Sequence, residues 1–176
     1  MSAAMHDQGK GGPPVEDNHY EAQLRRIDDL TRRALEGKVV IRGNERPWVT
    51  NRQGRLKFFV TRSQTDMVPC PFDLFIHDVQ THSGKHTHQG GLAIYVLEGH
   101  GHTVIDGKRV DWEKGDLILL PIKPGGVEHQ HFNSEIGKPA RWLAFYYSHY
   151  EEVLGNLFRQ NEESPHWSGR LGHHHN

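Results

Sequence analysis

Short apolar runs rich in β-branched and aromatic residues follow one another through most of the chain after Gly37. Gly, Pro, Asn and Asp separate these runs, and the pair Asp106-Gly107 is typical of a two-residue hairpin turn. Many short strands at this spacing predict an all-β sandwich, jelly roll or small barrel. The predicted strands are residues 39–42, 55–62, 72–80, 92–99, 102–110, 116–121 and 140–148.

Two segments with a helical period flank the predicted strands. Residues 18–37 begin at a capping Asn18 and predict an amphipathic helix, whose apolar face packs against this domain's sheet or against a partner subunit. Residues 150–160 predict a closing helix. The compact unit is therefore expected at 38–160, with a disordered tail at 1–17 and a polar tail at 161–176.

Length and charge exclude several classes of protein. A chain of 176 residues predicts one domain. Its net charge of −1 argues against binding to nucleic acid, and no apolar run is long enough to span a bilayer. The N-terminal residues contain no apolar run typical of a secretory signal, and the one cysteine, Cys70, fits a reducing compartment. These features predict a cytoplasmic protein without a membrane partner.

Histidine is the most informative residue type, with 15 copies. Leaving aside residues 173–175 at the C-terminus, six histidines form three His-x-His pairs, at 86/88, 100/102 and 129/131. Alternate residues of a strand point the same way, so His86 and His88 can converge on one cation. If the fold brings residue 129 to them, three imidazoles form a site with open positions for substrate and for oxygen or water. The alternative is three polar histidines on the surface.

Residues 84–99 and 115–133 resemble the two conserved motifs of the cupin superfamily. In the first motif, His86 and His88 match the histidine pair and Gly99 matches the closing glycine. In the second motif, the matching residues are Gly115, Pro121, Pro124, Gly126, His129 and Asn133, after a three-residue insertion. The resemblance implies a cupin jelly-roll β-barrel, here with an N-terminal and a C-terminal helix.

One departure from the motifs bears on the chemistry. Many cupins place a glutamate four residues after the second histidine, and this chain has Leu92 there. Glu98 is too far along the strand to replace it, at roughly 3.3 Å per residue. A three-histidine site without glutamate is similar to that of ferrous dioxygenases of the gentisate, 2,4'-dihydroxyacetophenone, thiol and diketone types.

The function predicted is that of a mononuclear Fe(II)-dependent dioxygenase, which binds its metal through His86, His88 and His129. Its substrate is expected to be a small phenolic or enolisable molecule whose C–C bond is cleaved with O2. Mn, Zn and Ni are the alternative metals, and the alternative functions are a redox-neutral decarboxylase, isomerase or lyase, or a non-catalytic ligand-binding cupin. A homodimer or larger homo-oligomer is expected, because the segment 18–37 is more than one barrel needs.

Further residues are candidates for roles around the metal. His131 shares the strand parity of His129 and is predicted to act as an acid–base group, with a substitute ligand or a core filler as alternatives. Five residues are candidates to line the substrate pocket: Gln89, Tyr95, His77, Trp142 and Tyr146.

Overall fold

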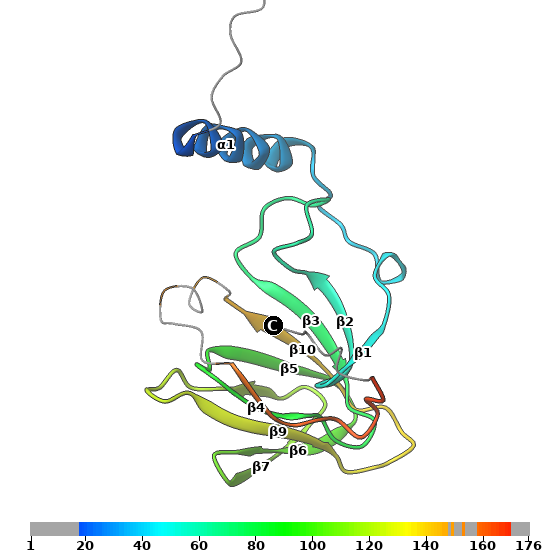
Figure 1. Ribbon diagram of the computed structural model, residues 1–176. Coiled ribbons are helices and arrows are strands. Elements are labelled where there is room, and N and C mark those ends of the chain that lie inside the picture. The colour runs from blue at the N-terminus through cyan, green and yellow to red at the C-terminus, as the bar shows by residue number, and fades with distance from the viewer. Residues whose placement is uncertain (1–17, 148, 150–152, 154–157, 170–176) are drawn as a thin grey trace, which may run out of the picture.

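The computed structural model describes residues 18–147, 149, 153 and 158–169, which form two antiparallel sheets and one long helix (Figure 1). The helical elements are α1, His19–Glu36, and the short 3-10 helix η1, Gly43–Glu45. The strands are β1 Val49–Asn51, β2 Gly54–Val60, β3 Asp73–Asp78, β4 Lys85–His88, β5 Leu92–Glu98, β6 His100–Ile105, β7 Lys108–Glu113, β8 Leu117–Leu119, β9 Val127–Asn133, β10 Arg141–Tyr146 and β11 Arg159–Glu162.

The strand order defines two separate sheets. One has the order β1-β2-β3-β10-β5-β8, and the other has the order β11-β4-β9-β6-β7. The predicted all-β architecture and the double-sheet arrangement of a jelly roll are present. The predicted closed barrel is wrong for the described residues, because no strand pairing joins the two sheets into one cylinder.

The core lies between the two sheets, where alternate residues of each strand point inward. In β5, for example, Leu92, Ile94 and Val96 are buried, whereas Tyr95 is exposed. Trp112 of β7 and Trp142 of β10 contribute the two largest side chains of the same cluster. Burial of these side chains supplies the main stabilising free energy of the fold.

The predicted hairpin at Asp106-Gly107 joins β6 to β7. Both residues have positive φ, 48° and 78°, as a type I′ turn requires. The ladder runs from Ile105↔Lys108 to His100↔Glu113. The predicted strand at 39–42 is wrong, because Val39 and Val40 are exposed and this segment crosses the surface without a ladder.

The N-terminal helix is present where the sequence predicts it. The Asn18 side chain caps α1 by accepting hydrogen bonds from the backbone N–H groups of Tyr20 and Glu21, at 3.0 and 3.2 Å. None of the residues of α1 is buried, and Figure 1 shows the helix standing apart from the two sheets. No helix in the described ranges combines the length and the apolar character needed to cross a bilayer.

The C-terminal segment differs from the prediction. Most of the predicted closing helix, 150–160, lies outside the described residues. At its described end, Arg159–Glu162 form β11 and pair with β4. Beyond this strand Ser164 is buried, and its N–H donates to the carbonyl of Arg52 at 2.8 Å, so this residue packs on the sheet. Residues 159–162 form a strand because they cover the otherwise open edge of β4, which carries His86 and His88.

Candidate metal centre

Three histidines from two neighbouring strands meet inside the fold. His86 and His88 lie on β4, His129 lies on β9, and the strand register places His86 directly opposite His129. The ring centroids are 4.2 Å apart for His86 and His129, 4.8 Å for His88 and His129, and 5.5 Å for His86 and His88. One nitrogen from each ring lies within 4.8 Å of the other two. The two motifs therefore meet as predicted.

Burial keeps these rings neutral. Desolvation lowers the pKa of His86 to about 4. Desolvation, followed by the charge of His86, lowers the pKa of His88 to about 3 and holds that of His129 well below its usual range. A metal ion binds the neutral imidazole, so the site is in its binding-competent form at pH 7 without having to lose protons to solvent.

A backbone group orients one of the three rings. The N–H of Gly90 donates to Nδ1 of His88 at 2.9 Å, which leaves Nε2 as the nitrogen that this ring can offer to a cation. The buried Nδ1 atoms of His86 and His129 have no hydrogen-bond partner among the residues that the structure describes. Buried polar atoms without partners are costly, and a bound cation would relieve that cost at this cluster. The donor set and its burial therefore fit a metal.

The turn after His88 depends on Gly90. This residue has a φ of +89°, and a Cβ built on it would lie 1.9 Å from the carbonyl oxygen of Pro121. We expect Gly90→Ala to destabilise the fold by more than the ~1–3 kcal/mol that backbone strain alone costs, because the clash adds to it, and to weaken metal binding by displacing His88. Denaturant unfolding and metal titration measure both effects.

The matched control for this turn is Gly107→Ala. Gly107 also has a positive φ, +78°, but a Cβ there would meet no atom within 4 Å. Its substitution introduces strain without a clash and lies far from His88 in the sequence. Equal losses of stability and equal metal affinity in the two variants would contradict the importance of the contact with Pro121.

A small cleft opens onto the histidines. Its volume is about 200 Å³, and both His86 and His88 line it. The other lining residues are mostly apolar side chains, with two amides among them: Asn51, Gln53, Phe58, Phe75, Leu92, Tyr146 and Phe158. A cleft of this size accepts a small ligand, below the range typical of drug-sized molecules.

No carboxylate belongs to the cluster among the described residues. Leu92 is buried, as its inward position on β5 requires, and it lines the cleft with an apolar side chain. Glu98 is engaged elsewhere, in an ion pair with Arg141 at 3.1 Å. The sequence-based exclusion of both residues as ligands agrees with this geometry.

His131 lies deeper than the three clustered histidines. Its ring centroid is 5.2 Å from that of His129 and 4.7 Å from that of Trp142. Trp112 Nε1 donates to Thr103 Oγ1 at 2.9 Å, and that hydroxyl in turn bonds His131 Nδ1 at 2.8 Å. Burial holds the pKa of His131 well below its usual range. The acid–base role stays a prediction, and these contacts favour a ring that supports His129.

The five predicted pocket residues occupy different places. Tyr146 lines the cleft. His77 and Trp142 pack against each other in the interior at 4.9 Å, and neither is among the residues that line the cleft. Gln89 is buried with both side-chain polar atoms unpartnered. The prediction that Tyr95 lines the pocket is wrong, because this side chain points outward and is 43% exposed.

Six residues line the cleft without having been predicted to do so: Asn51, Gln53, Phe58, Phe75, Leu92 and Phe158. Phe58 and Phe75 face each other from β2 and β3 at 5.6 Å, and the alternation of their strands was the available signal. Asn51 is the last residue of β1 and Gln53 lies in the turn that follows it, where no sequence pattern marks them.

The central part of the chain matches a known protein family. Residues 74–146 match the cupin domain model. The match runs from β3 to β10 and contains all three clustered histidines. The matched residues therefore include the three clustered histidines and most of the core, but not α1 or β11. No curated protein sequence matches this chain.

Solved structures share the fold at low sequence identity. Salicylate 1,2-dioxygenase from Pseudoaminobacter salicylatoxidans, in adducts with gentisate, aligns with a TM-score of 0.51 and 19% identity over 84% of this chain and 37% of that chain. A Streptomyces PAC13 variant with uridine aligns with a TM-score of 0.52 and 15% identity over 72% of this chain and 92% of that chain. This chain spans 28% to 37% of the dioxygenase chains. Such similarity shows the fold, and the chemistry has to be argued from the residues.

Proposed function

We propose that this protein is a mononuclear metal-dependent cupin oxygenase, and specifically an Fe(II)-dependent dioxygenase that cleaves a C–C bond of a small phenolic or enolisable substrate. The observation that carries the proposal is the cluster of three neutral imidazoles without a carboxylate, beside an apolar cleft. Neutral ligands leave the full charge of a divalent cation available for substrate oxygens.

The proposed ligands are His86, His88 and His129, one nitrogen from each. Imidazole suits Fe, Zn, Cu and Ni, so the donor set alone does not select the metal. With three protein ligands, an octahedral ion retains three positions, enough for a bidentate substrate and one further small molecule. When bound, Fe(II) would supply Lewis acidity toward the substrate oxygens and the electrons for O2 activation.

The cleft determines which substrates fit. Phe58, Phe75 and Leu92 present apolar surface next to the histidines, where they would hold a flat ring and exclude water. The amides of Asn51 and Gln53 line the same cleft and are the polar groups available for substituents remote from the metal. At about 200 Å³ the cleft restricts the substrate to about the size of a single ring.

The proposal is tested by loading the full-length protein anaerobically with Fe(II) and measuring oxygen consumption against a panel of small phenols, hydroxybenzoates and 1,3-diketones. We expect binding of one Fe(II) per chain and consumption of one O2 for each substrate molecule cleaved. Parallel loading with Mn, Zn and Ni identifies the metal. Turnover that survives without O2 would instead indicate a redox-neutral enzyme, and tight ligand binding without turnover would indicate a binding protein.

A further inference from the structure

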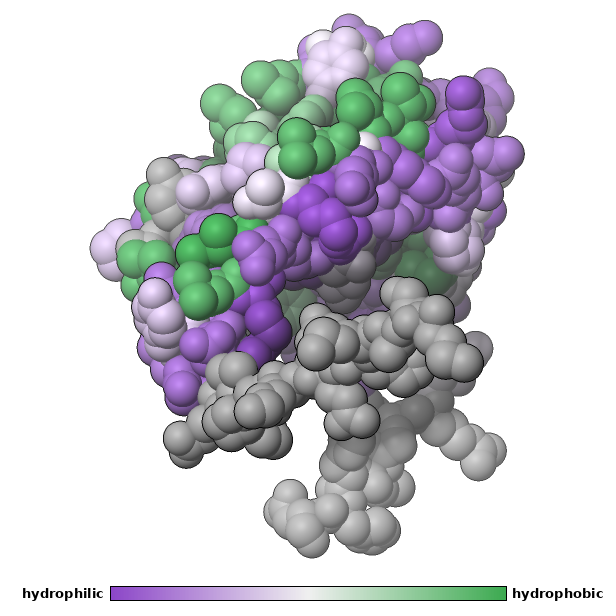
Figure 2. Space-filling view, turned by 90° about the horizontal axis from the view of Figure 1, so that it is seen from above, coloured by the Kyte–Doolittle hydropathy of each residue, from purple (hydrophilic) through white to green (hydrophobic). Residues whose placement is uncertain are grey.

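The apolar stripe of α1 has no partner within the described chain. It consists of Tyr20, Leu24, Ile27 and Leu30, which are between 38% and 66% exposed. Figure 2 looks onto the side of the molecule that carries α1 and shows hydrophobic side chains gathered beside a hydrophilic band. Most of the stability of a protein helix comes from packing its apolar face, so a partner is required for this stripe.

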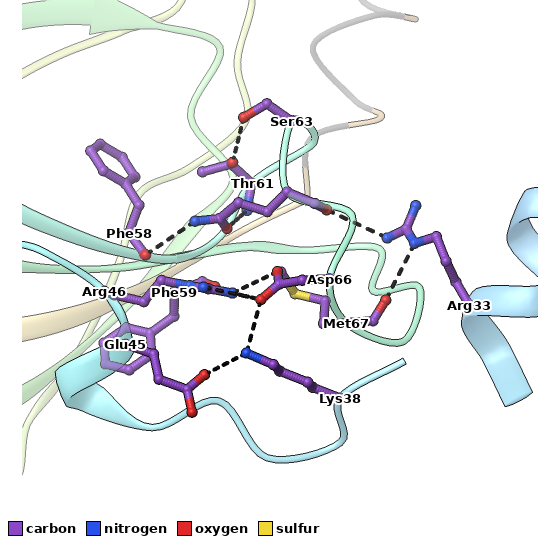
Figure 3. Close-up of polar contacts among 11 residues, drawn as sticks. Arg33, Lys38, Glu45, Arg46, Phe58, Phe59, Thr61, Ser63, Asp66 and Met67 are labelled. Carbon is purple, nitrogen blue, oxygen red and sulfur yellow. Dashed lines mark hydrogen bonds and ion pairs between the residues drawn. The ribbon is translucent and has the colours of Figure 1, made fainter. Parts of the chain in front are cut away.

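The helix is fixed to its own domain by a different side. Arg33 Nε donates to the carbonyl of Met67 at 3.3 Å, and Lys38 forms a backbone bridge with the same residue (Figure 3). Gly37 packs so closely on this loop that a Cβ would lie 2.5 Å from the carbonyl carbon of Met67. At 3.6 residues per turn, Arg33 is about 120° around the helix from Ile27. Tyr20, Leu24 and Ile27 therefore point away from the loop that holds the helix, whereas Leu30 lines a cleft together with Arg33 and Met67.

The chain exposes a second apolar surface on the outer face of β5, β8 and β10. We define the outer apolar patch as Ala93, Tyr95, Leu117, Leu119, Leu143 and Phe145. These residues are cross-strand neighbours on the side of the sheet that faces away from the core. Leu117 and Leu119 are 58% and 65% exposed, and no member of the patch is charged.

Charged residues border the patch at one end of the strands. Arg55 and Arg141 both bond Asp78, at 2.6 and 3.2 Å, and Arg141 also bonds Glu98 at 3.1 Å. An apolar centre with a polar border is the usual organisation of a protein–protein interface.

We propose that the outer apolar patch binds α1 of a second copy of this chain, so that each subunit of a homodimer provides one helix and receives one. Both surfaces are apolar, both belong to the same chain, and the attachment of α1 at Gly37 and Met67 leaves Tyr20, Leu24 and Ile27 pointing away from its own loop. At roughly 100 Å² per side chain, the two surfaces together present several hundred Å², on the scale of the ~800 Å² that each subunit of a stable dimer buries.

The test uses two variants of the full chain, Ile27→Glu on the stripe and Leu119→Glu on the patch, each with a matched control. Ala22→Glu places the same charge on the polar side of α1, and Val110→Glu places it on an exposed strand of the other sheet. Sedimentation equilibrium at micromolar concentration gives the mass, and circular dichroism verifies folding. We expect dimers for the wild type and both controls and at least a tenfold weaker association for both test variants.

Mixing the two test variants distinguishes the proposed contact from other ways of pairing. The intact helix of the Leu119→Glu chain can dock on the intact patch of the Ile27→Glu chain, so the mixture is expected to form heterodimers more tightly than either variant pairs with itself. A monomeric wild type would overturn the proposal. So would loss of the dimer in only one of the two variants, or a mixture that remains monomeric, because these results indicate helix–helix or sheet–sheet pairing.

Discussion

Replacing His129 with alanine is expected to abolish stoichiometric metal binding and oxygen-dependent turnover. His129 is the most buried of the three clustered histidines, at 1% exposed, and it is the only one on β9. Without it the two remaining imidazoles come from one strand and cannot surround a cation. Because altering a residue that merely supports a ligand already costs about 10–100-fold in metal affinity, we expect a loss of at least ~100-fold for the ligand itself.

Isothermal titration with Fe(II) under argon, and with Mn(II) in air, measures this loss. The matched control is His100→Ala, because His100 is an exposed histidine at the start of β6 and lies outside the cluster. It should bind metal as the wild type does. Unchanged affinity in His129→Ala, with intact folding, would show that the three rings do not share one cation.

Replacing Leu92 with glutamate tests the absence of a carboxylate. Leu92 is 7% exposed and lines the cleft beside His86 and His88. In the metal-free protein, an unpaired carboxylate at this place is expected to lower the free energy of unfolding by about 3–5 kcal/mol. A divalent cation would then restore stability, because the new carboxylate can join the three imidazoles as a ligand.

The same substitution is expected to strengthen metal binding and to suppress oxygen consumption, since a carboxylate reduces both the positive charge and the number of open positions. Thermal unfolding with and without Mn(II), together with oxygen uptake of the iron form, measures the two effects. Leu92→Gln serves as the control, because the glutamine side chain has nearly the same shape as that of glutamate but carries no charge. Metal-independent stability in Leu92→Glu would place position 92 away from the ion.

The sequence predicted the cluster because its geometry follows from strand parity. His86 and His88 are two residues apart on one strand, so they had to share a face, and the resemblance of residues 115–133 to the second cupin motif indicated His129. The pair Asp106-Gly107 likewise marked the hairpin between β6 and β7. The strand parity and the turn pair do not depend on the rest of the fold, whereas the contact of His129 with His86 depends on the pairing of β4 with β9.

Other features depended on contacts that a single strand does not reveal. β5 is apolar on both faces, so nothing in its sequence indicated that Tyr95 points outward while its neighbours Ile94 and Val96 point inward. The segment Arg159–Glu162 is polar, and it forms a strand because it covers the edge of β4. The apolar residues at Val39 and Val40 resemble a strand but find no partner.

X-ray absorption at the iron edge of the anaerobically loaded full-length protein tests the central claim most directly. The account predicts one Fe(II) per chain whose outer-shell scattering corresponds to three imidazoles, from His86, His88 and His129, with weak oxygen donors completing the sphere. Substoichiometric binding, fewer than three imidazoles per iron, or a protein carboxylate as a ligand would contradict it.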